Sequence, residues 1–204
     1  VAALQVEQEF VCEDHRPEGN RQYFHLRRTR DNRDFDVLLD LQGSYQCRNI
    51  VTASAAIDFL HEETPLTISR RAYLEGMCCA AANTALLGRW QTLAEAPLTV
   101  CDTGHNESGI AEVAAQIARQ TYRKLYMVVG FVEDKDLSRV LPLLPRQAHY
   151  VFTKAGIRRA LDERELARRA AGYGLQGECV PTVNEALARA RELSLIHISE
   201  PTRQ

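Results

Sequence analysis

The first forty residues contain short runs in which apolar and polar side chains alternate, the pattern of half-buried β-strands. In one run, Phe24 and Leu26 fall on one side of the expected strand and His25 falls on the other. Polar stretches with turn-forming residues separate the runs. The three expected strands cover residues 6–11, 21–29 and 35–41, and their short connections predict an antiparallel meander.

After residue 45 the apolar residues recur at helical spacing. The first expected helix covers residues 46–62, with Ile50, Ala53, Ile57 and Leu60 along one face. The second covers about residues 69–84, with Ala72, Met77 and Ala81 facing inward. We expect the two helices to form an antiparallel pair that closes a first structural unit.

From Gly88 onward, expected strands alternate with expected helices. The strands are predicted at residues 90–94, 98–102, 124–132 and 149–153. The helices are predicted at residues 110–117, 137–144, 163–172 and from 183, where Thr182 and Glu185 have the spacing of a capping box. This alternation predicts an α/β fold, a Rossmann-like, mainly parallel sheet flanked by helices, preceded by the meander and the helix pair.

Composition narrows the classes of function. The 204 residues are 45% hydrophobic and 25% charged, with a formal net charge of -2, which does not favour an electrostatic nucleic-acid binder. No apolar run is long enough to cross a bilayer and no secretory signal pattern opens the chain, so neither a membrane nor a nucleic acid is expected as partner.

The six cysteines form no CxxC pair and are interpreted as reduced, mostly buried residues of a cytoplasmic protein. Cys12 and His15 have a ligand-like spacing, but no second pair completes a zinc site in the sequence, so no metal ligand is assigned.

Three segments carry candidate chemistry. The first, Gly43–Asn49, lies between an expected strand and an expected helix. The amide of Asn49 is placed either to hydrogen-bond a ligand or to cap the helix. The second is Gly88-Arg89-Trp90-Gln91, where Arg89 is either a phosphate-binding guanidinium or a surface residue beside a structural tryptophan.

The third segment, residues 100–109, joins the end of an expected strand to the start of a helix, where ligands of α/β sheets bind. The helix N-terminus favours anions. Asp102 is suited to accept hydrogen bonds from a ribose, and His105 to meet a phosphate or a developing negative charge; the alternative is a well-capped turn. The chain holds no GxxxxGK[ST] phosphate loop, GxSxG or HExxH motif, so a complete catalytic nucleotide site is not visible.

In this order, the three segments resemble the C-terminal half of the folylpolyglutamate synthase/dihydrofolate synthase family, which belongs to the Mur ligase superfamily. The resemblance covers about residues 1–193. It includes Leu41–Ala53, Gly88–Gln91, Asp102–Gly109 and Val129–Asp136, whose last residues are Asp-Lys-Asp.

The resemblance implies an ATP-dependent ligase that adds L-glutamate to dihydropteroate or a folate through an acyl phosphate. It implies ATP contacts at Asn49, Arg89 and Asp102, which we expect to converge on a common hollow. It gives His105 a supporting catalytic role and places Asp134, Lys135 and Asp136 on the amino-acid side of the cleft.

The same resemblance implies a chain truncated at both ends. Residues 1–86 match the end of the central ATPase domain, and residues 87–193 match the C-terminal Rossmann-like domain. The phosphate loop, the Mg²⁺ ligands and much of the pterin pocket are expected in a missing N-terminal domain, so the fragment alone is expected to be inactive. Residues 194–204 resemble translated sequencing-adaptor sequence and are interpreted as a non-native tail.

Two other functions are compatible with the sequence. One is another Mur-type amide ligase, such as an enzyme that builds peptidoglycan precursors. The other is a non-catalytic α/β module that binds a small ligand or a partner.

Overall fold

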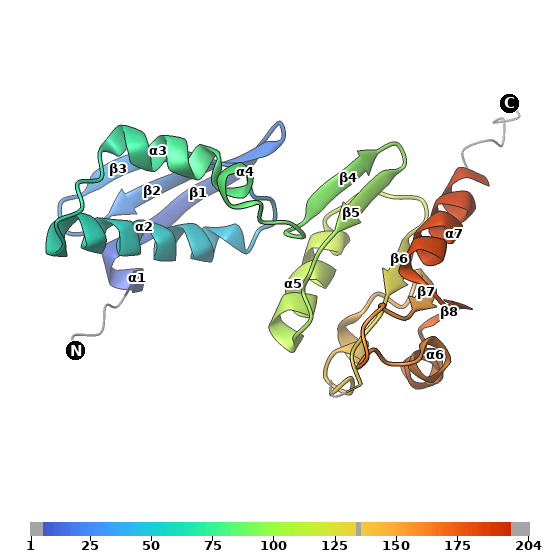
Figure 1. Cartoon of the computed structure of the whole chain (residues 1–204). Coiled ribbons are helices and arrows are strands. Elements are labelled where there is room, and N and C mark those ends of the chain that lie inside the picture. Colours follow the sequence, from blue (N-terminus) through green and yellow to red (C-terminus); the bar gives the residue numbers. More distant parts are fainter. Residues whose placement is uncertain (1–5, 134–135, 197–204) are drawn as a thin grey trace, which may run out of the picture. The chain divides into compact units, whose positions relative to one another are not determined.

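The computed structural model describes residues 6–133 and 136–196, and the chain divides into two compact units (Figure 1). The first unit comprises residues 1–92 and 100–103, and the second comprises residues 93–99 and 104–204. The two units interleave over residues 93–103, so the division gives no single boundary in this region. The expected domain boundary between residues 86 and 87 therefore stays a prediction.

The first unit is built on an antiparallel sheet with the strand order β1-β2-β3. The strands are β1 (Phe10–Glu18), β2 (Arg21–Arg28) and β3 (Arg33–Leu39). Along β2 every second residue is buried, and Phe24 and Leu26 are fully enclosed, which confirms the alternation. The first strand begins later than expected, because residues Val6–Glu9 form the short helix α1.

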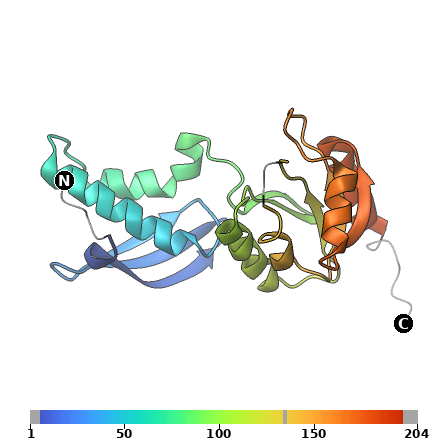
Figure 2. The same ribbon diagram turned by 90° about the horizontal axis from the view of Figure 1, so that it is seen from below.

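Helices α2 (Gln46–Glu63), α3 (Arg70–Cys78) and α4 (Ala80–Thr84) follow the sheet, and α2 and α3 lie over one of its faces (Figure 2). Their apolar side chains complete one core with the inner face of the sheet. The expected single helix over residues 69–84 is interrupted at Cys79, whose backbone leaves the helical region. Ala72 is exposed, contrary to expectation, and Tyr73 is buried in its stead.

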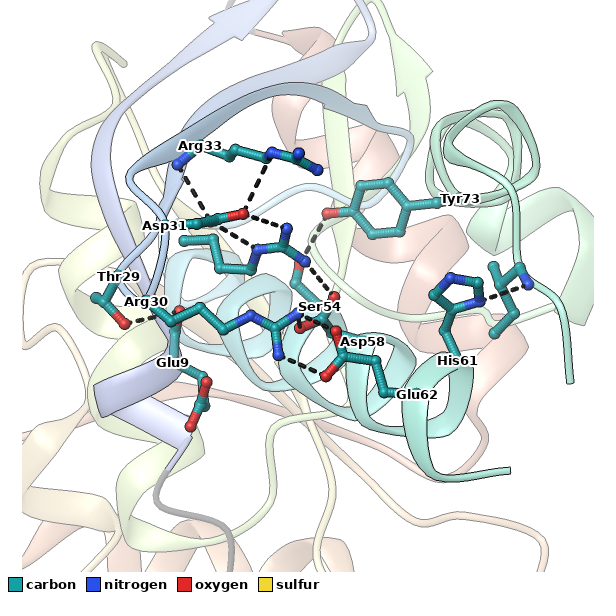
Figure 3. A network of polar contacts seen from close by, with 12 residues as sticks. Glu9, Thr29, Arg30, Asp31, Arg33, Ser54, Asp58, His61, Glu62 and Tyr73 are labelled. Carbon is teal, nitrogen blue, oxygen red and sulfur yellow. Dashed lines mark hydrogen bonds and ion pairs between the residues drawn. The ribbon is translucent and has the colours of Figure 1, made fainter. Parts of the chain in front are cut away.

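A charged network ties the sheet to α2 (Figure 3). The buried guanidinium of Arg28 donates to Asp31 at 2.6 Å and to Asp58 of α2 at 2.6 Å. Arg30 bridges Asp58 at 2.9 Å and also pairs with Glu62. Because Arg28 is desolvated, it needs both carboxylates to offset the loss of water.

The Arg28–Asp58 contact generates a stability prediction. We expect Asp58→Asn to lower the free energy of unfolding of the first unit by about 1–2 kcal/mol, since Arg28 keeps Asp31 but loses one desolvated charge partner. Urea denaturation measures this change. The matched control Glu62→Gln removes an exposed pair and is expected to change stability by less than about 0.5 kcal/mol. Equal effects of the two substitutions would contradict the assignment.

The second unit contains a parallel sheet with the strand order β6-β7-β8, which confirms the α/β fold class. The strands are β6 (Tyr126–Val129), β7 (His149–Thr153) and β8 (Gln176–Val180), and the helices are α5 (Glu107–Ala118), α6 (Glu163–Ala171) and α7 (Val183–Ile196). Helix α6 packs against β7 and β8, and α7 packs against β6 and β7. Tyr150 and Phe152 of β7 stack at the centre of the core.

Several elements of the second unit differ from the expectation. Strand β8 was not predicted, because its sequence is mostly polar and contains Gly177. That glycine is required by packing, since a Cβ there would lie 1.8 Å from the carbonyl oxygen of Tyr150. The helix expected at residues 137–144 is only the 3-10 turn η1 (Leu141–Leu143), whose middle residue is Pro142.

The two strands expected near residues 90–102 form their own sheet. Strands β4 (Gln91–Glu95) and β5 (Leu98–Cys101) pair with each other across a two-residue connection, a length that permits only an antiparallel hairpin. In the described part of the chain they are not strands of the parallel sheet.

Helix α7 continues through Ser194 to Ile196, so the first residues of the expected tail are helical, and residues 197–204 lie outside the described residues. The interpretation of residues 194–204 as non-native stays a prediction. Within residues 6–133 and 136–196, no helix combines the length and apolar character needed to cross a membrane.

The cysteines are free thiols, but they are less buried than expected. Five are half-buried and Cys179 is exposed. Cys12 is the most perturbed, because burial and the neighbouring sulfur of Cys47 raise the pKa of its thiol to about 12.

Candidate functional site

Asp102 connects the candidate segments of the first unit. It follows the last residue of β5, and its Oδ2 accepts hydrogen bonds from the backbone N–H of Trp90 at 2.8 Å and from the hydroxyl of Tyr45 at 3.2 Å. Tyr45 belongs to the segment Gly43–Asn49, and Trp90 to the segment Gly88–Gln91. Three segments that are far apart in the sequence therefore meet at one carboxylate.

Gly88 supports this junction with a backbone conformation that favours glycine. Its φ is +71°, and a Cβ would lie 2.3 Å from Cγ2 of Thr103. The carbonyl oxygen of Gly88 accepts from the N–H of Thr103 at 2.9 Å and from its hydroxyl at 3.0 Å. The close approach fixes the turn 88–91 beside the end of β5.

Arg89 lies on this turn and donates from Nη1 to Oγ1 of Thr103 at 2.6 Å. Arg89 and Asp102 therefore lie beside the same turn, which the Trp90 N–H joins to Asp102. A guanidinium presents several N–H donors in a fixed plane, and this contact engages one nitrogen. The side chain is chemically suited to bind a phosphate, which stays a prediction.

Asn49 is exposed on the first turns of α2, and its Nδ2 donates to Oε1 of the buried Gln46 at 2.9 Å. The helix-capping alternative is wrong, since α2 begins after Tyr45 and has no side-chain cap. Asn49 is joined to the junction indirectly, because Tyr45 of the preceding turn contacts Asp102. The common hollow expected among Asn49, Arg89 and Asp102 stays a prediction.

His105 belongs to the second unit, where it is exposed and directly precedes the N-cap of α5. The cap is Asn106, whose Oδ1 accepts from the N–H of Gly109 at 2.7 Å. The segment 104–109 is therefore a capped helix start, and the expected catalytic role of His105 stays a prediction.

Asp136 lies in a local turn of the second unit. Its Oδ1 accepts from the N–H of Ser138 at 3.0 Å and from its hydroxyl at 2.6 Å, which lowers the pKa of the Asp136 carboxyl. It lines a hollow of about 320 Å³ together with Arg169 and Tyr173. Asp134 and Lys135 lie outside the described residues.

The sequence reasoning did not single out Tyr45 and Thr103, although both lie inside the quoted segments. Tyr45 reaches Asp102 across 57 residues of sequence, and Thr103 holds both Gly88 and Arg89. Local spacing carries no signal for such contacts, because they depend on how the sheet, α2 and β5 pack.

The parallel sheet, with α6 in the crossover between β7 and β8, defines an α/β protein of the Rossmann-like class. The polar cluster around Asp102 follows β5 of the separate β4–β5 hairpin, so the expectation that it lies at the end of a strand of the parallel sheet is wrong. The family model for the Mur ligase, glutamate ligase domain, matches residues 88–196. The chain belongs to this family.

Similar proteins agree with this assignment. The chain is 32% identical over 164 residues to a probable bifunctional folylpolyglutamate synthase/dihydropteroate synthase of Haloferax volcanii, covering 79% of this chain and 18% of the relative. It is 26% identical over 162 residues to a folylpolyglutamate synthase of Lacticaseibacillus casei, covering 78% of this chain and 35% of that protein.

Among solved structures, a folylpolyglutamate synthase of Mycobacterium tuberculosis complexed with ADP matches with a TM-score of 0.75 and 25% identity, over 92% of this chain and 41% of that one. The chain therefore spans less than half of the length of these relatives. Its similarity to them runs through both compact units.

The Gly88 turn generates a second prediction. We expect Gly88→Ala to lower the free energy of unfolding by about 1–3 kcal/mol, because alanine is strained at φ +71° and meets Thr103. Trp90, the single tryptophan of the chain, reports the local change through its emission. The control Gly76→Ala lies in helix α3 with nothing within 4 Å of the added Cβ, so it is expected to stabilise slightly. A neutral Gly88→Ala would refute the close approach.

Proposed function

We propose that this chain forms part of an ATP-dependent ligase that adds L-glutamate to dihydropteroate, to a folate, or to both. The observation that carries the proposal is the Asp102 carboxylate, which joins the segments that hold Asn49 and Arg89. The named relatives are folate-type synthases, and one solved relative carries ADP. Because the chain spans less than half of these relatives, the activity is proposed for the longer protein.

The chemistry of the proposed reaction explains the residue types. A carboxylate is a poor electrophile, so a carboxylate oxygen first attacks the γ-phosphorus of ATP and ADP leaves. The amino nitrogen of glutamate then attacks the acyl carbon, phosphate leaves, and the nitrogen loses a proton. Both steps bring anions together, so positioning and charge stabilisation dominate catalysis.

Each candidate residue receives a role in this scheme. Arg89 binds the phosphates, Asp102 holds the ribose side of the nucleotide, and Asn49 contributes an amide contact. The contact of Arg89 with Thr103 and that of Asp102 with the Trp90 N–H support these roles, because they hold both side chains at the strand end. His105 meets developing negative charge, and Asp134, Lys135 and Asp136 face the amino acid.

Mg²⁺ accompanies ATP in the proposed reaction, and its ligands are assigned to the N-terminal ATPase domain of the longer protein. In the described part of the chain, the cluster of three side chains with metal-ligand spacing contains two cysteines and a histidine. This set does not fit Mg²⁺, which takes oxygen ligands. We place the reaction in the cytoplasm, where ATP is available and free thiols such as those of this chain persist.

The alternative of a peptidoglycan-type ligase shares the C-terminal domain fold, but the named relatives are folate-type enzymes. The alternative of a non-catalytic module predicts no glutamate addition, so an activity assay distinguishes it from the ligase. The decisive assay uses the protein produced with its upstream coding sequence, ATP, Mg²⁺, glutamate, and dihydropteroate or a folate.

We expect this protein to form the glutamate adduct together with ADP and phosphate. Arg89→Ala is expected to reduce kcat/KM for ATP by about 100-fold, because a charged contact to the phosphates is lost. The control Arg71→Ala removes an exposed arginine of α3 that pairs with Glu75, and is expected to leave activity unchanged. Absence of product at every Mg²⁺ concentration, or equal activity of the two variants, would argue against the proposal.

A further inference from the structure

Three side chains with metal-ligating atoms meet in the first unit. Cys12 and His15 come from β1, and Cys47 comes from the first turn of α2. Their two sulfurs and an imidazole nitrogen all lie within 4.8 Å of one another. The sulfurs of Cys12 and Cys47 are 3.1 Å apart. The sequence alone shows the spacing of Cys12 and His15, but only the fold adds Cys47, 35 residues away.

An irregularity in β1 brings Cys12 and His15 to the same face of the sheet. In a regular strand, residues three apart point to opposite faces. Here the pairing register shifts between Cys12 and Asp14, so that Cys12 lies opposite Leu26 and His15 lies opposite Phe24. Both partners on β2 are buried, so both potential ligands belong to the side that α2 covers.

The neighbouring residues hold the ligands in position. The imidazole of His15 stacks on the ring of Phe24 with centroids 6.0 Å apart and an angle of 9°. The two cysteines are half-buried and pack against the apolar core of the first unit. Cys47 lies in the first turn of α2, one residue after the helix begins. His15 is exposed, which leaves a path to solvent on its side of the cluster.

We propose that Cys12, His15 and Cys47 form a binding site for Zn²⁺, with water at the fourth position. A Cys₂His ligand set with one open position is a known arrangement for this ion. Ideal bond lengths of about 2.3 Å for sulfur in a tetrahedral site place two thiolates about 3.8 Å apart. The Cys12 and Cys47 sulfurs therefore need to separate by about 0.7 Å from their present 3.1 Å, a small side-chain adjustment.

A disulfide between Cys12 and Cys47 is the competing interpretation. It requires the sulfurs to approach from 3.1 Å to about 2.05 Å. It also assigns no role to His15, which the shifted register turns toward the two cysteines. The three-residue cluster therefore favours the metal over the disulfide.

Metal binding at this position connects β1 directly to the first turn of α2. That turn follows Tyr45, which contacts Asp102, and it carries Asn49. The proposed ion thus fixes the start of the helix on which the junction of the first unit depends. The metal site itself stands on the three ligands and does not depend on the proposed ligase activity.

The test uses the full 204-residue chain, reduced and freed of metal, titrated with Co²⁺ and then with Zn²⁺. We expect one equivalent of Co²⁺ to produce thiolate-to-cobalt charge-transfer absorption, and Zn²⁺ to displace it. We expect Cys47→Ser to abolish this absorption and to reduce Zn²⁺ affinity by more than about 100-fold. Loss of a residue that only supports a metal ligand typically reduces affinity by about 10- to 100-fold, so the larger loss identifies Cys47 as a ligand. His15→Gln is expected to keep the thiolate absorption but to weaken binding.

The matched control is Cys179→Ser, which removes an exposed cysteine of the second unit and is expected to bind like the unaltered chain. Thermal unfolding gives an independent measurement, because Zn²⁺ is expected to raise the Tm of the chain and of Cys179→Ser, but not that of Cys47→Ser. Trp90 emission verifies that each variant is folded. The proposal is overturned if the folded, reduced chain gives no charge-transfer absorption, if the absorption persists in Cys47→Ser, or if mass spectrometry of the chain isolated under metal-replete conditions finds a Cys12–Cys47 disulfide in place of zinc.

Discussion

One carboxylate joins the candidate segments of the first unit. Asp102 follows the last residue of β5 and accepts from the Tyr45 hydroxyl and the Trp90 N–H. A carboxylate that accepts hydrogen bonds from two separate segments holds both in register more firmly than a neutral group, because charge-assisted hydrogen bonds are the stronger kind. Arg89 lies next to Trp90 on one of these segments, and Asn49 lies four residues after Tyr45 on the other.

Several contacts attach the helices of the first unit to its sheet. Helices α2 and α3 cover the inner face with apolar side chains, and Arg28 joins the sheet to α2 through Asp58. At the opposite end of α2, Cys47 lies against Cys12 of β1. The helix is therefore attached to the sheet near both of its ends, by a charge network at one and by the contact between the Cys12 and Cys47 thiols at the other.

The sequence was sufficient for elements whose signal is local. The alternation around Phe24 and Leu26 predicts β2, the helical spacing around Ile50 predicts α2, and the apolar run ending in Phe152 predicts β7. It was insufficient for β8, which is mostly polar and forms a strand by parallel pairing with β7, where Gly177 lies close to Tyr150. After the break at Cys79, the N–H groups of Ala81 and Ala82 donate to Asp40, which lies 41 and 42 residues away, and the short turn at Leu141–Leu143 contains Pro142.

For the candidate site, too, the sequence predicts the local features and misses the contacts made by the fold. The motifs point to Asn49, Arg89 and Asp102. They do not predict that Tyr45 contacts Asp102 or that Thr103 contacts Arg89, because these contacts cross long stretches of sequence. Cys12 and His15 show a ligand spacing, yet the third ligand, Cys47, is brought to them only by the fold. Residue types thus indicate which chemistry is available, and the tertiary contacts decide where it assembles.

The central claim is that the Tyr45 hydroxyl and the Asp102 carboxylate interact directly, and a double-mutant cycle with Tyr45→Phe and Asp102→Ala tests it. Urea denaturation of the four proteins gives the coupling free energy between the two side chains. The structure predicts a coupling of about 1 kcal/mol, the net contribution of one hydrogen bond. Additive effects, with a coupling indistinguishable from zero, would show that the two segments are not joined at Asp102.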